Sequence, residues 1–240
     1  MGSTVQECVV AIGAGSRADL LAMLPLHYRA RPPRGVVRVL AARDECDGLV
    51  GVLAVSMPAL NSPVRELAWP GRYRTGRPLA DARRLNDELR TISRVVVHPA
   101  RRGRGIARLM VREYLERPLT RATEALAADG RRSRFFERAG MVRYDLPPGP
   151  ARARLADAAA FVGVRAGDLR DAGRAMAVFR CLPPRARALL DRELRRWADG
   201  SRGTRRLADG PVLDLLLSAG AALRSARACG YAHVVAGARA

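Results

Sequence analysis

The segment from Val95 to Ala107 constrains the fold of this chain more than any other part of it. It reads Val-Val-Val-His-Pro-Ala-Arg-Arg-Gly-Arg-Gly-Ile-Ala, and apolar residues at helical spacing follow it as far as Glu116. A strand, a glycine-containing turn and a helix are therefore predicted in direct succession. The first amides of a helix have no partner within the helix, and glycines let a ligand approach them, so this turn is expected to bind an anion.

Cations surround the turn, because Arg101, Arg102, Arg104 and Arg108 all lie in it or beside it. The chain of 240 residues contains 43 Arg and no Lys against 23 Asp and Glu, which gives a formal charge of +20. Replacement of every Lys by Arg is typical of a coding bias, so a single arginine is weak evidence for binding. The absence of Lys does exclude a P-loop lysine and Schiff-base chemistry.

The chain has two consecutive parts that differ in amino-acid composition. Residues 1–146 mix β-branched runs with turns, residues 151–240 are rich in Ala, Arg and Leu with almost no strand-like run, and the proline-rich residues 147–150 are expected to link them. We therefore predict an α/β (α+β) first domain and a helical C-terminal extension of unknown role. A stripe of Leu190, Leu194 and Trp197 in the extension is expected to pack against the first domain, and a partner-binding helix is the alternative.

The predicted elements alternate between strands and helices in the first domain and are helical in the extension. In chain order they are a helix from 17 to 24 opened by a capping box at Ser16 and Asp19, a hairpin of strands 36–42 and 49–57, helix 79–89, strand 91–97, helix 105–116, strand 122–127, helix 131–139, strand 141–144, and helices 168–181, 184–198 and 212–228.

The remaining composition points to a soluble cytoplasmic protein. The four cysteines have no spacing typical of a metal site, no signal peptide is visible, and no apolar run reaches the length of a membrane span. We expect neither a bound metal nor a membrane partner, and the oligomeric state is left open.

Two segments resemble motifs of the GNAT N-acetyltransferases. Residues 102–107 match that family's Arg/Gln-x-x-Gly-x-Gly/Ala pyrophosphate motif, and residues 131–141, about 30 residues later, resemble its Phe-Tyr-x-x-x-Gly-Phe segment. The resemblance covers residues 1–146 and implies a GNAT-type mixed sheet flanked by helices, with acetyl-CoA or coenzyme A between the fourth and fifth strands. It implies that the cofactor is held by Val95, Val96 and Val97 at the pantetheine and by Arg102, Gly103, Arg104, Gly105, Ile106 and Ala107 at the pyrophosphate.

A narrower resemblance involves short upstream segments. His27-Tyr28-Arg29, Gly51-Val52-Leu53, Pro58 to Asn61, and Leu85-Asn86 ahead of Arg94 are similar to the bacteriophage Mom family of adenine-modifying enzymes and to acetyltransferase-like domains fused to ABC-type ATPases. The resemblance implies substrate contacts at Tyr28, Asn61, Asn86 and Arg94, and it leaves nucleic acid open as a substrate. The loop of residues 69–74, with aromatics among arginines, is expected either to stack on bases or to close over an active site.

Acyl transfer to an ammonium substrate needs a base, for which Glu124, on the predicted strand that faces the cleft, and His27 are the candidates. GNAT enzymes often use the tyrosine of the Phe-Tyr segment as a general acid, but Phe136 stands there in this chain. Tyr144 or Tyr28 are alternatives, or the thiolate leaves without help, because thiols titrate near ~8.5. Three functions follow: an N-acetyltransferase of an unknown amine, a Mom-like protein that modifies or binds nucleic acid, and a pseudoenzyme that only binds coenzyme A.

Overall fold

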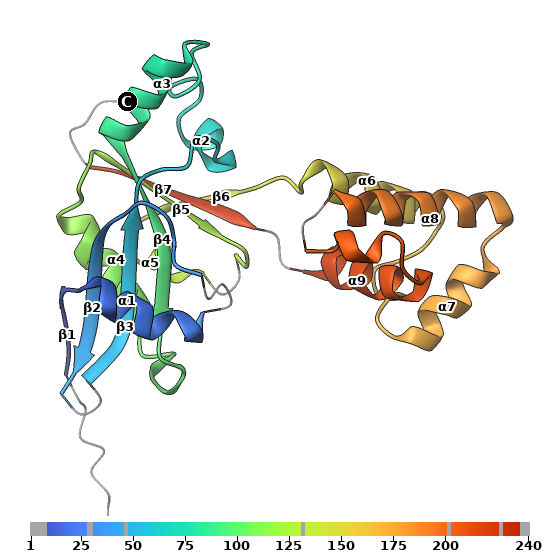
Figure 1. The fold of residues 1–240 in the computed structure, drawn as a ribbon, viewed down its shortest axis with the longest axis horizontal. Coiled ribbons are helices and arrows are strands. Elements are labelled where there is room, and N and C mark those ends of the chain that lie inside the picture. Colours follow the sequence, from blue (N-terminus) through green and yellow to red (C-terminus); the bar gives the residue numbers. More distant parts are fainter. Residues whose placement is uncertain are drawn as a thin grey trace, which may run out of the picture. The chain divides into compact units, whose positions relative to one another are not determined.

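The computed structural model describes residues 9–27, 31–45, 48–130, 133–200, 203–225 and 228–235 (Figure 1). The chain forms two compact units, of which the first comprises residues 1–146 and 228–240 and the second residues 147–227. Each unit has hydrophobic clusters of its own. Among the described residues, no helix is long and apolar enough to cross a membrane.

The first unit is built on one sheet, which has seven strands within the described residues. In chain order the strands are β1 (Val10–Ala14), β2 (Val36–Asp44), β3 (Gly48–Ser56), β4 (Leu89–Val97), β5 (Ala122–Ala127), β6 (Val142–Asp145) and β7 (Cys229–Val234). Their order across the sheet is β1-β2-β3-β4-β5-β7-β6. The β4–β5 pair is parallel and the other neighbouring pairs are antiparallel.

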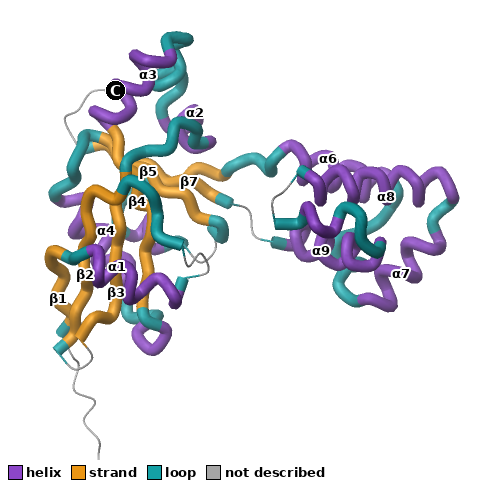
Figure 2. Tube along the Cα trace, in the orientation of Figure 1, coloured by secondary structure: helices purple, strands orange, loops and turns teal. Residues whose placement is uncertain are grey.

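Helices cover both faces of this sheet (Figure 2). They are α1 (Arg17–Met23), α2 (Pro63–Ala68), α3 (Pro78–Glu88), α4 (Ile106–Glu116) and α5 (Phe135–Arg138), with short 3-10 helices η1 (Leu24–Leu26) and η2 (Pro99–Arg101). Successive residues of β3 divide between two clusters: Val52 packs with Leu20 of α1, and Leu53 packs with Met110 of α4. Because side chains alternate along a strand, α1 and α4 lie on opposite faces.

Most of the predicted elements of the first domain are present with small shifts at their ends. The capping box opens α1, where the amide of Asp19 donates to Ser16 Oγ at 3.1 Å and the amide of Ser16 donates to Asp19 Oδ2 at 2.7 Å. β2 and β3 form the predicted hairpin. The sequence pattern missed β1 and α2, which are short.

The second unit is helical in its described residues. Its elements are α6 (Pro150–Phe161), α7 (Ala172–Cys181), α8 (Pro184–Asp199), the 3-10 helix η3 (Arg205–Leu207) and α9 (Val212–Arg224). The stripe of Leu190, Leu194 and Trp197 on α8 packs in the unit's own core with Leu215 and Leu216. The expectation that the stripe covers the first domain is therefore corrected, because the unit is large enough to enclose it.

The prediction of a helical extension from 151 to 240 is wrong for its last part. Residues 229–234 form β7, which pairs with β5 on one side and β6 on the other. Gly230 permits this placement, because a Cβ there would lie 2.3 Å from Val64 of α2. The expected linker is also shorter, since Pro150 is already the first residue of α6, a position at which proline is tolerated.

Candidate functional site

β4 and β5 diverge halfway along their length. They pair from Leu89 opposite Ala122 to Ile92 opposite Ala125, and both strands continue beyond that point without pairing to each other. Where they diverge, β4 contains a bulge, because Ser93 is skipped in its pairing with β3. A bulge bends a strand and turns its backbone groups, so the divergence is built into the sheet.

A cavity of about 490 Å³ lies between the diverging strands, and we call it the β4–β5 cleft. Its lining residues come from β4, from β5 and the residues after it, from the α5 region and from the end of η1. They are Thr91, Ile92, Ser93, Arg94, Val95, Leu126, Ala127, Ala128, Asp129, Ser133, Phe135, Phe136 and His27.

The free edge of β4 offers backbone groups to this cleft. The amide of His98 donates to Val50 O at 2.9 Å, so the backbone groups of His98 face β3. Alternation along the strand directs the amides and carbonyls of Val95 and Val97 to the opposite edge, which β5 does not cover. There the Val97 carbonyl accepts a hydrogen bond from Arg102 Nε at 3.3 Å. An extended ligand with amide groups can add to such an edge as a further strand would.

The glycine turn at the end of β4 leads directly into α4. Gly103 and Gly105 have φ values of 84° and 78°, and Gly105 is the N-cap residue of α4, with no side chain capping the helix. A Cβ at either glycine would meet no atom within 4 Å. The turn is therefore open at both glycines, and the first amides of a helix have no partner within the helix, which are two conditions of a phosphate site.

The four arginines at the turn are not equivalent. Arg101 forms an ion pair with Asp44 at 2.9 Å, and its side chain is only 14% exposed, so it supports the fold. Arg102 and Arg108 are exposed and donate to backbone carbonyl groups. Because a carbonyl group is neutral, these contacts do not compensate the charge of the two arginines. Arg104 is exposed. Three cations thus remain near the amides of the turn.

Glu124 is not among the residues that line the cleft, although the sequence placed it there as a base. Arg65 of α2 donates to its carboxylate from Nη2 at 2.7 Å and from Nε at 3.1 Å, and Thr91 Oγ1 donates at 2.9 Å. The side chain is 1% exposed. With both oxygens occupied and no access to solvent, Glu124 is poorly placed to take a proton from a substrate.

His27 and Arg94 do line the cleft. His27 follows η1 and is half-buried, and its amide donates to Leu24 O at 2.9 Å. Arg94 donates from Nη1 to Ser93 O at 2.6 Å and from Nη2 to Arg31 O at 3.2 Å. The structure therefore brings together one candidate base and one candidate substrate contact.

The other sequence candidates lie elsewhere or outside the described residues. Tyr144 of β6 packs with the cluster around Trp69 and does not line the cleft. Asn61, before α2, and Asn86, on α3, are exposed and are also absent from the lining. Tyr28 falls outside the described residues.

Tyr231, which was not expected from the sequence to take part in the site, is a neighbour of the cleft. Its ring lies 4.8 Å from that of Phe136, and its hydroxyl lies 3.2 Å from both Ser133 Oγ and Cys229 Sγ. Ser133 Oγ donates to Asp129 O at 2.7 Å, so both hydroxyl groups have hydrogen-bond partners. Burial, reinforced by the hydrogen bond with Cys229, raises the pKa of the Tyr231 phenol well above its usual value. The phenol therefore joins β7 to the cleft wall as a neutral group.

The aromatic loop of residues 69–74 is packed rather than presented to a partner. Trp69 is 8% exposed, and Tyr73 meets it edge to face with ring centroids 6.0 Å apart. The hydroxyl of Tyr73 donates to Glu88 Oε2 at 3.2 Å. These contacts contradict the expectation that both rings are free to stack on bases.

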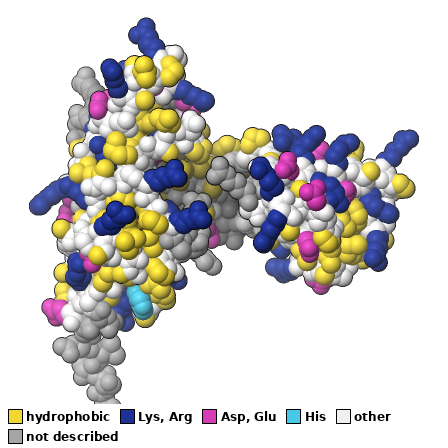
Figure 3. Space-filling model, in the orientation of Figure 1, with side chains coloured by type: hydrophobic (Ala, Val, Ile, Leu, Met, Phe, Trp, Pro, Cys, Tyr) yellow, Lys and Arg dark blue, Asp and Glu magenta, His cyan; other side chains and the backbone are white. Residues whose placement is uncertain are grey.

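The face drawn in Figure 3 shows no single basic patch that would favour binding of a nucleic acid, because arginine side chains are spread over both units there. Within the described part of the chain, no group of three or more His, Cys, Asp or Glu residues is arranged to hold a metal ion.

Comparison with known proteins gives distant structural likenesses only. No family model matches the sequence, and no curated protein matches it. Among solved structures, the GNAT family N-acetyltransferase YhbS from Escherichia coli in complex with CoA has 16% identity and a TM-score of 0.39, over 59% of this chain and 73% of that chain.

Two further solved structures are similar at the same level. A spermidine N-acetyltransferase chimera from Vibrio cholerae and hSSAT has 14% identity and a TM-score of 0.36, over 56% of this chain and 82% of that one. A mutant agmatine N-acetyltransferase in its apo form has 12% identity and a TM-score of 0.37, over 59% of this chain and 94% of that one. Likenesses this distant say nothing of a substrate.

Proposed function

We propose that the first unit is a GNAT-type N-acyltransferase that takes its acyl group from a coenzyme A thioester. The observation that carries the proposal is the continuity of β4 with the glycine turn. Val95 and Val97 direct backbone groups to the free edge of β4, and Gly103 and Gly105 follow within the same segment at the uncapped start of α4. One extended ligand with amides along its length and phosphates at its end meets both features.

The residues present fit coenzyme A. Its pantetheine arm has amide groups, which match the free edge of β4 beyond Ile92. Its pyrophosphate matches the open space above Gly103 and Gly105, where no side chain caps the helix and where Arg102, Arg104 and Arg108 supply positive charge.

The chain's own residues supply binding, orientation and one base. When bound, the thioester supplies an acyl group on a leaving thiolate. His27, at the cleft, is the candidate to take the proton of an ammonium substrate, in preference to the buried Glu124. A backbone amide on the free edge of β4, that of Val95, is the candidate donor to the oxygen that becomes negative.

No tyrosine of the described residues lines the cleft, and Phe136 occupies the place of the family's usual acid. The thiolate is therefore proposed to leave without a proton from the protein, which is compatible with the ordinary acidity of thiols near ~8.5.

Calorimetric titration with acetyl-CoA and with coenzyme A tests the cofactor, and release of thiol in the presence of amines or DNA tests the reaction. Micromolar binding with amine-dependent thiol release supports the proposal. Binding without release under all acceptors would mean a pseudoenzyme. No binding at millimolar ligand, with DNA retained in a salt-dependent manner, would replace the proposal by a nucleic-acid function.

A further inference from the structure

The bulge in β4 changes which of its residues face each side of the sheet. Before the bulge, the even-numbered Ile92 packs in the cluster on the α4 face. After it, the odd-numbered Val95 and Val97 pack against that same cluster, and Val96 packs in the cluster on the α1 face. Odd and even positions have therefore exchanged faces at Ser93, because one extra residue reverses the alternation of side chains along a strand.

The same exchange decides which backbone groups the β4–β5 cleft receives. The amide of His98 donates to Val50 O, so even-numbered positions after the bulge face β3, whereas Val95 and Val97 face the cleft. Without the extra residue, the backbone groups of Val96 would be directed to the cleft instead. The bulge therefore sets the register in which an extended ligand can add to the free edge of β4.

Two hydroxyl groups hold the bulge against β3, and we call Ser56 and Ser93 the serine pair. Ser93 Oγ donates to Ala54 O at 3.1 Å and lies 2.7 Å from Ser56 Oγ. Since the single hydroxyl proton of Ser93 is directed to a carbonyl, Ser56 is the donor of the second hydrogen bond. Ser56 is 3% exposed, so the pair is closed to solvent on the β3 side. The residue that the ladder skips is thus bonded to β3 through its side chain.

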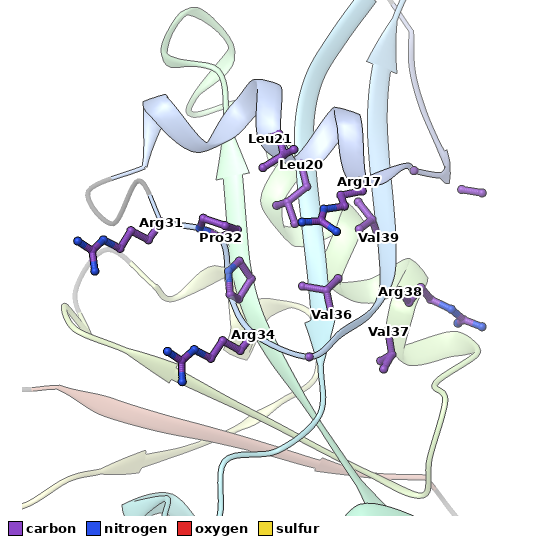
Figure 4. Close-up of a pocket in the computed structure, with 14 residues that line it drawn as sticks. Arg17, Leu20, Leu21, Arg31, Pro32, Arg34, Val36, Val37, Arg38 and Val39 are labelled. Carbon is purple, nitrogen blue, oxygen red and sulfur yellow. The ribbon is translucent and has the colours of Figure 1, made fainter.

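Arg94 adds a restraint at the carbonyl of Ser93. Its Nη1 donates to Ser93 O at 2.6 Å, and its Nη2 donates to Arg31 O at 3.2 Å. Figure 4 shows Arg31 at the start of a segment that leads into β2 and forms one wall of a cavity of about 1000 Å³ beside α1. The amide of Met57 donates to Gly35 O at 2.8 Å and fixes that segment. The bulge is therefore held through both its side chain and its carbonyl.

We propose that Ser56 and Ser93 are positioning residues for the pantetheine arm of coenzyme A, because they fix the bulge that turns Val95 and the amide of Val97 toward the cleft. The proposal rests on the proposed acyltransferase function, and both residues act through the backbone of β4 rather than on the reacting atoms. A bulge released from the serine pair would have to form again before the arm could add. The apparent affinity would then fall with the fraction of molecules in which the bulge is formed.

The test is a calorimetric titration of the full chain with two ligands. One is coenzyme A, and the other is its nucleotide part, which has the pyrophosphate and no pantetheine arm. In Ser93→Ala the affinity for coenzyme A should fall by roughly tenfold, whereas the affinity for the nucleotide part, which meets only the glycine turn, should stay unchanged. Ser93→Thr keeps the hydroxyl and should restore the affinity. Ser56→Ala removes one of the two hydrogen bonds and should cause a smaller loss.

The matched control is Thr204→Ala in the second unit. Thr204 Oγ1 donates to Ala198 O at 3.0 Å, so this variant also loses a hydrogen bond from a hydroxyl to a backbone carbonyl. It should leave both affinities unchanged. Equal loss for both ligands in Ser93→Ala would show a general effect of destabilisation and would overturn the proposal. Binding by Ser93→Thr that is as weak as that of Ser93→Ala would also overturn it.

The unchanged protein separates this proposal from the cofactor proposal. If it binds coenzyme A and a folded Ser93→Ala protein binds it equally well, only the role of the serine pair is refuted. If the unchanged protein does not bind coenzyme A, the cofactor proposal fails, and the role of the serine pair fails with it.

Discussion

Arg65 of α2 donates two hydrogen bonds to the carboxylate of Glu124 on β5, and both side chains are almost wholly buried. The pair lies one position before the last contact between β4 and β5, because Glu124 is opposite Thr91 in the register. Nη1 of Arg65 also donates to Leu60 O at 2.8 Å. A charged pair thus attaches the loop before α2 to the point from which the cleft opens.

Breaking this pair should destabilise the first unit strongly. Arg65→Met leaves the Glu124 carboxylate buried without its partner, at a cost of about 3–5 kcal/mol in the free energy of unfolding. The double variant Arg65→Met/Glu124→Leu should recover much of the loss. Chemical denaturation measures both, and Arg112→Met, at an exposed ion pair, should cost less than about 1 kcal/mol. Equal effects at Arg65 and Arg112 would contradict the structural role.

A carboxylate at the glycine turn should abolish coenzyme A binding. Gly105→Glu places negative charge at the start of α4, where the pyrophosphate is proposed to lie. Gly76→Glu is the matched control, because Gly76 also has positive φ, at 84°, and open space at its Cβ, so both variants carry a similar backbone strain of about 1–2 kcal/mol. Calorimetry should show loss of binding in the first variant alone. Binding that survives in a folded Gly105→Glu protein would refute the turn assignment.

Removal of the imidazole at the cleft should slow acyl transfer without weakening cofactor binding. His27→Gln is expected to lower kcat by about 10²–10⁴-fold, the usual contribution of a general base, while the Kd for coenzyme A stays unchanged. His98→Gln, at an exposed position beside the turn, is the control and should keep its activity. If Glu124→Gln lowers kcat in a stably folded protein while His27→Gln does not, the base is Glu124.

Alkaline pH should destabilise the first unit through its buried tyrosines. Burial raises the pKa of Tyr114 and of Tyr231, so above pH ~10 the unfolded chain loses phenol protons that the folded chain retains. Stability is therefore full below the unfolded pKa and falls as the pH rises through the folded pKa. The free energy of unfolding, measured between neutral and strongly alkaline pH, should show this loss. Tyr231→Phe should reduce the slope of that free energy against pH. An unchanged slope would mean that the Tyr231 phenol loses its proton in the folded protein as readily as in the unfolded chain.

The second unit should be removable without loss of the sheet. The amide of Leu146 donates to Ala228 O at 3.4 Å, and Asp145 is paired with Cys229, so β6 and β7 are two strands of an antiparallel pair whose ends meet. Replacing residues 147–227 by an Asn-Gly turn converts them into a hairpin. Circular dichroism and coenzyme A titration should show a folded, binding-competent chain, whereas a chain that stops at Leu146 should fail both measurements.

The local elements of the first domain were largely predictable, and their assembly was not. The capping residues of α1 and the strand–turn–helix segment around Gly105 are local signals, and they gave the correct elements. β7 has no such signal, because Ala232 and Gly230 are poor strand formers and become strand only by pairing with β5 and β6.

The candidate site, too, could be predicted from the sequence only in part. The turn could be found from its glycines, and its role as a cofactor site stays a prediction. The partner of Glu124 could not be found, because Arg65 is one arginine among 43 and lies 59 positions earlier in the chain. Tyr231 could not be assigned to the site for a related reason, since it reaches Phe136 only through the pairing of β7.

The position of β7 between β5 and β6 sets the order in which a growing chain completes its sheet. A ribosome releases β5 and β6 first and the whole of residues 147–227 next, and β7 emerges only after them. Until then the edge of β5 stays unpaired and able to join strands of other chains. Self-association of the nascent protein is thus the hazard of this topology, and the time needed to translate the second unit sets how long it lasts.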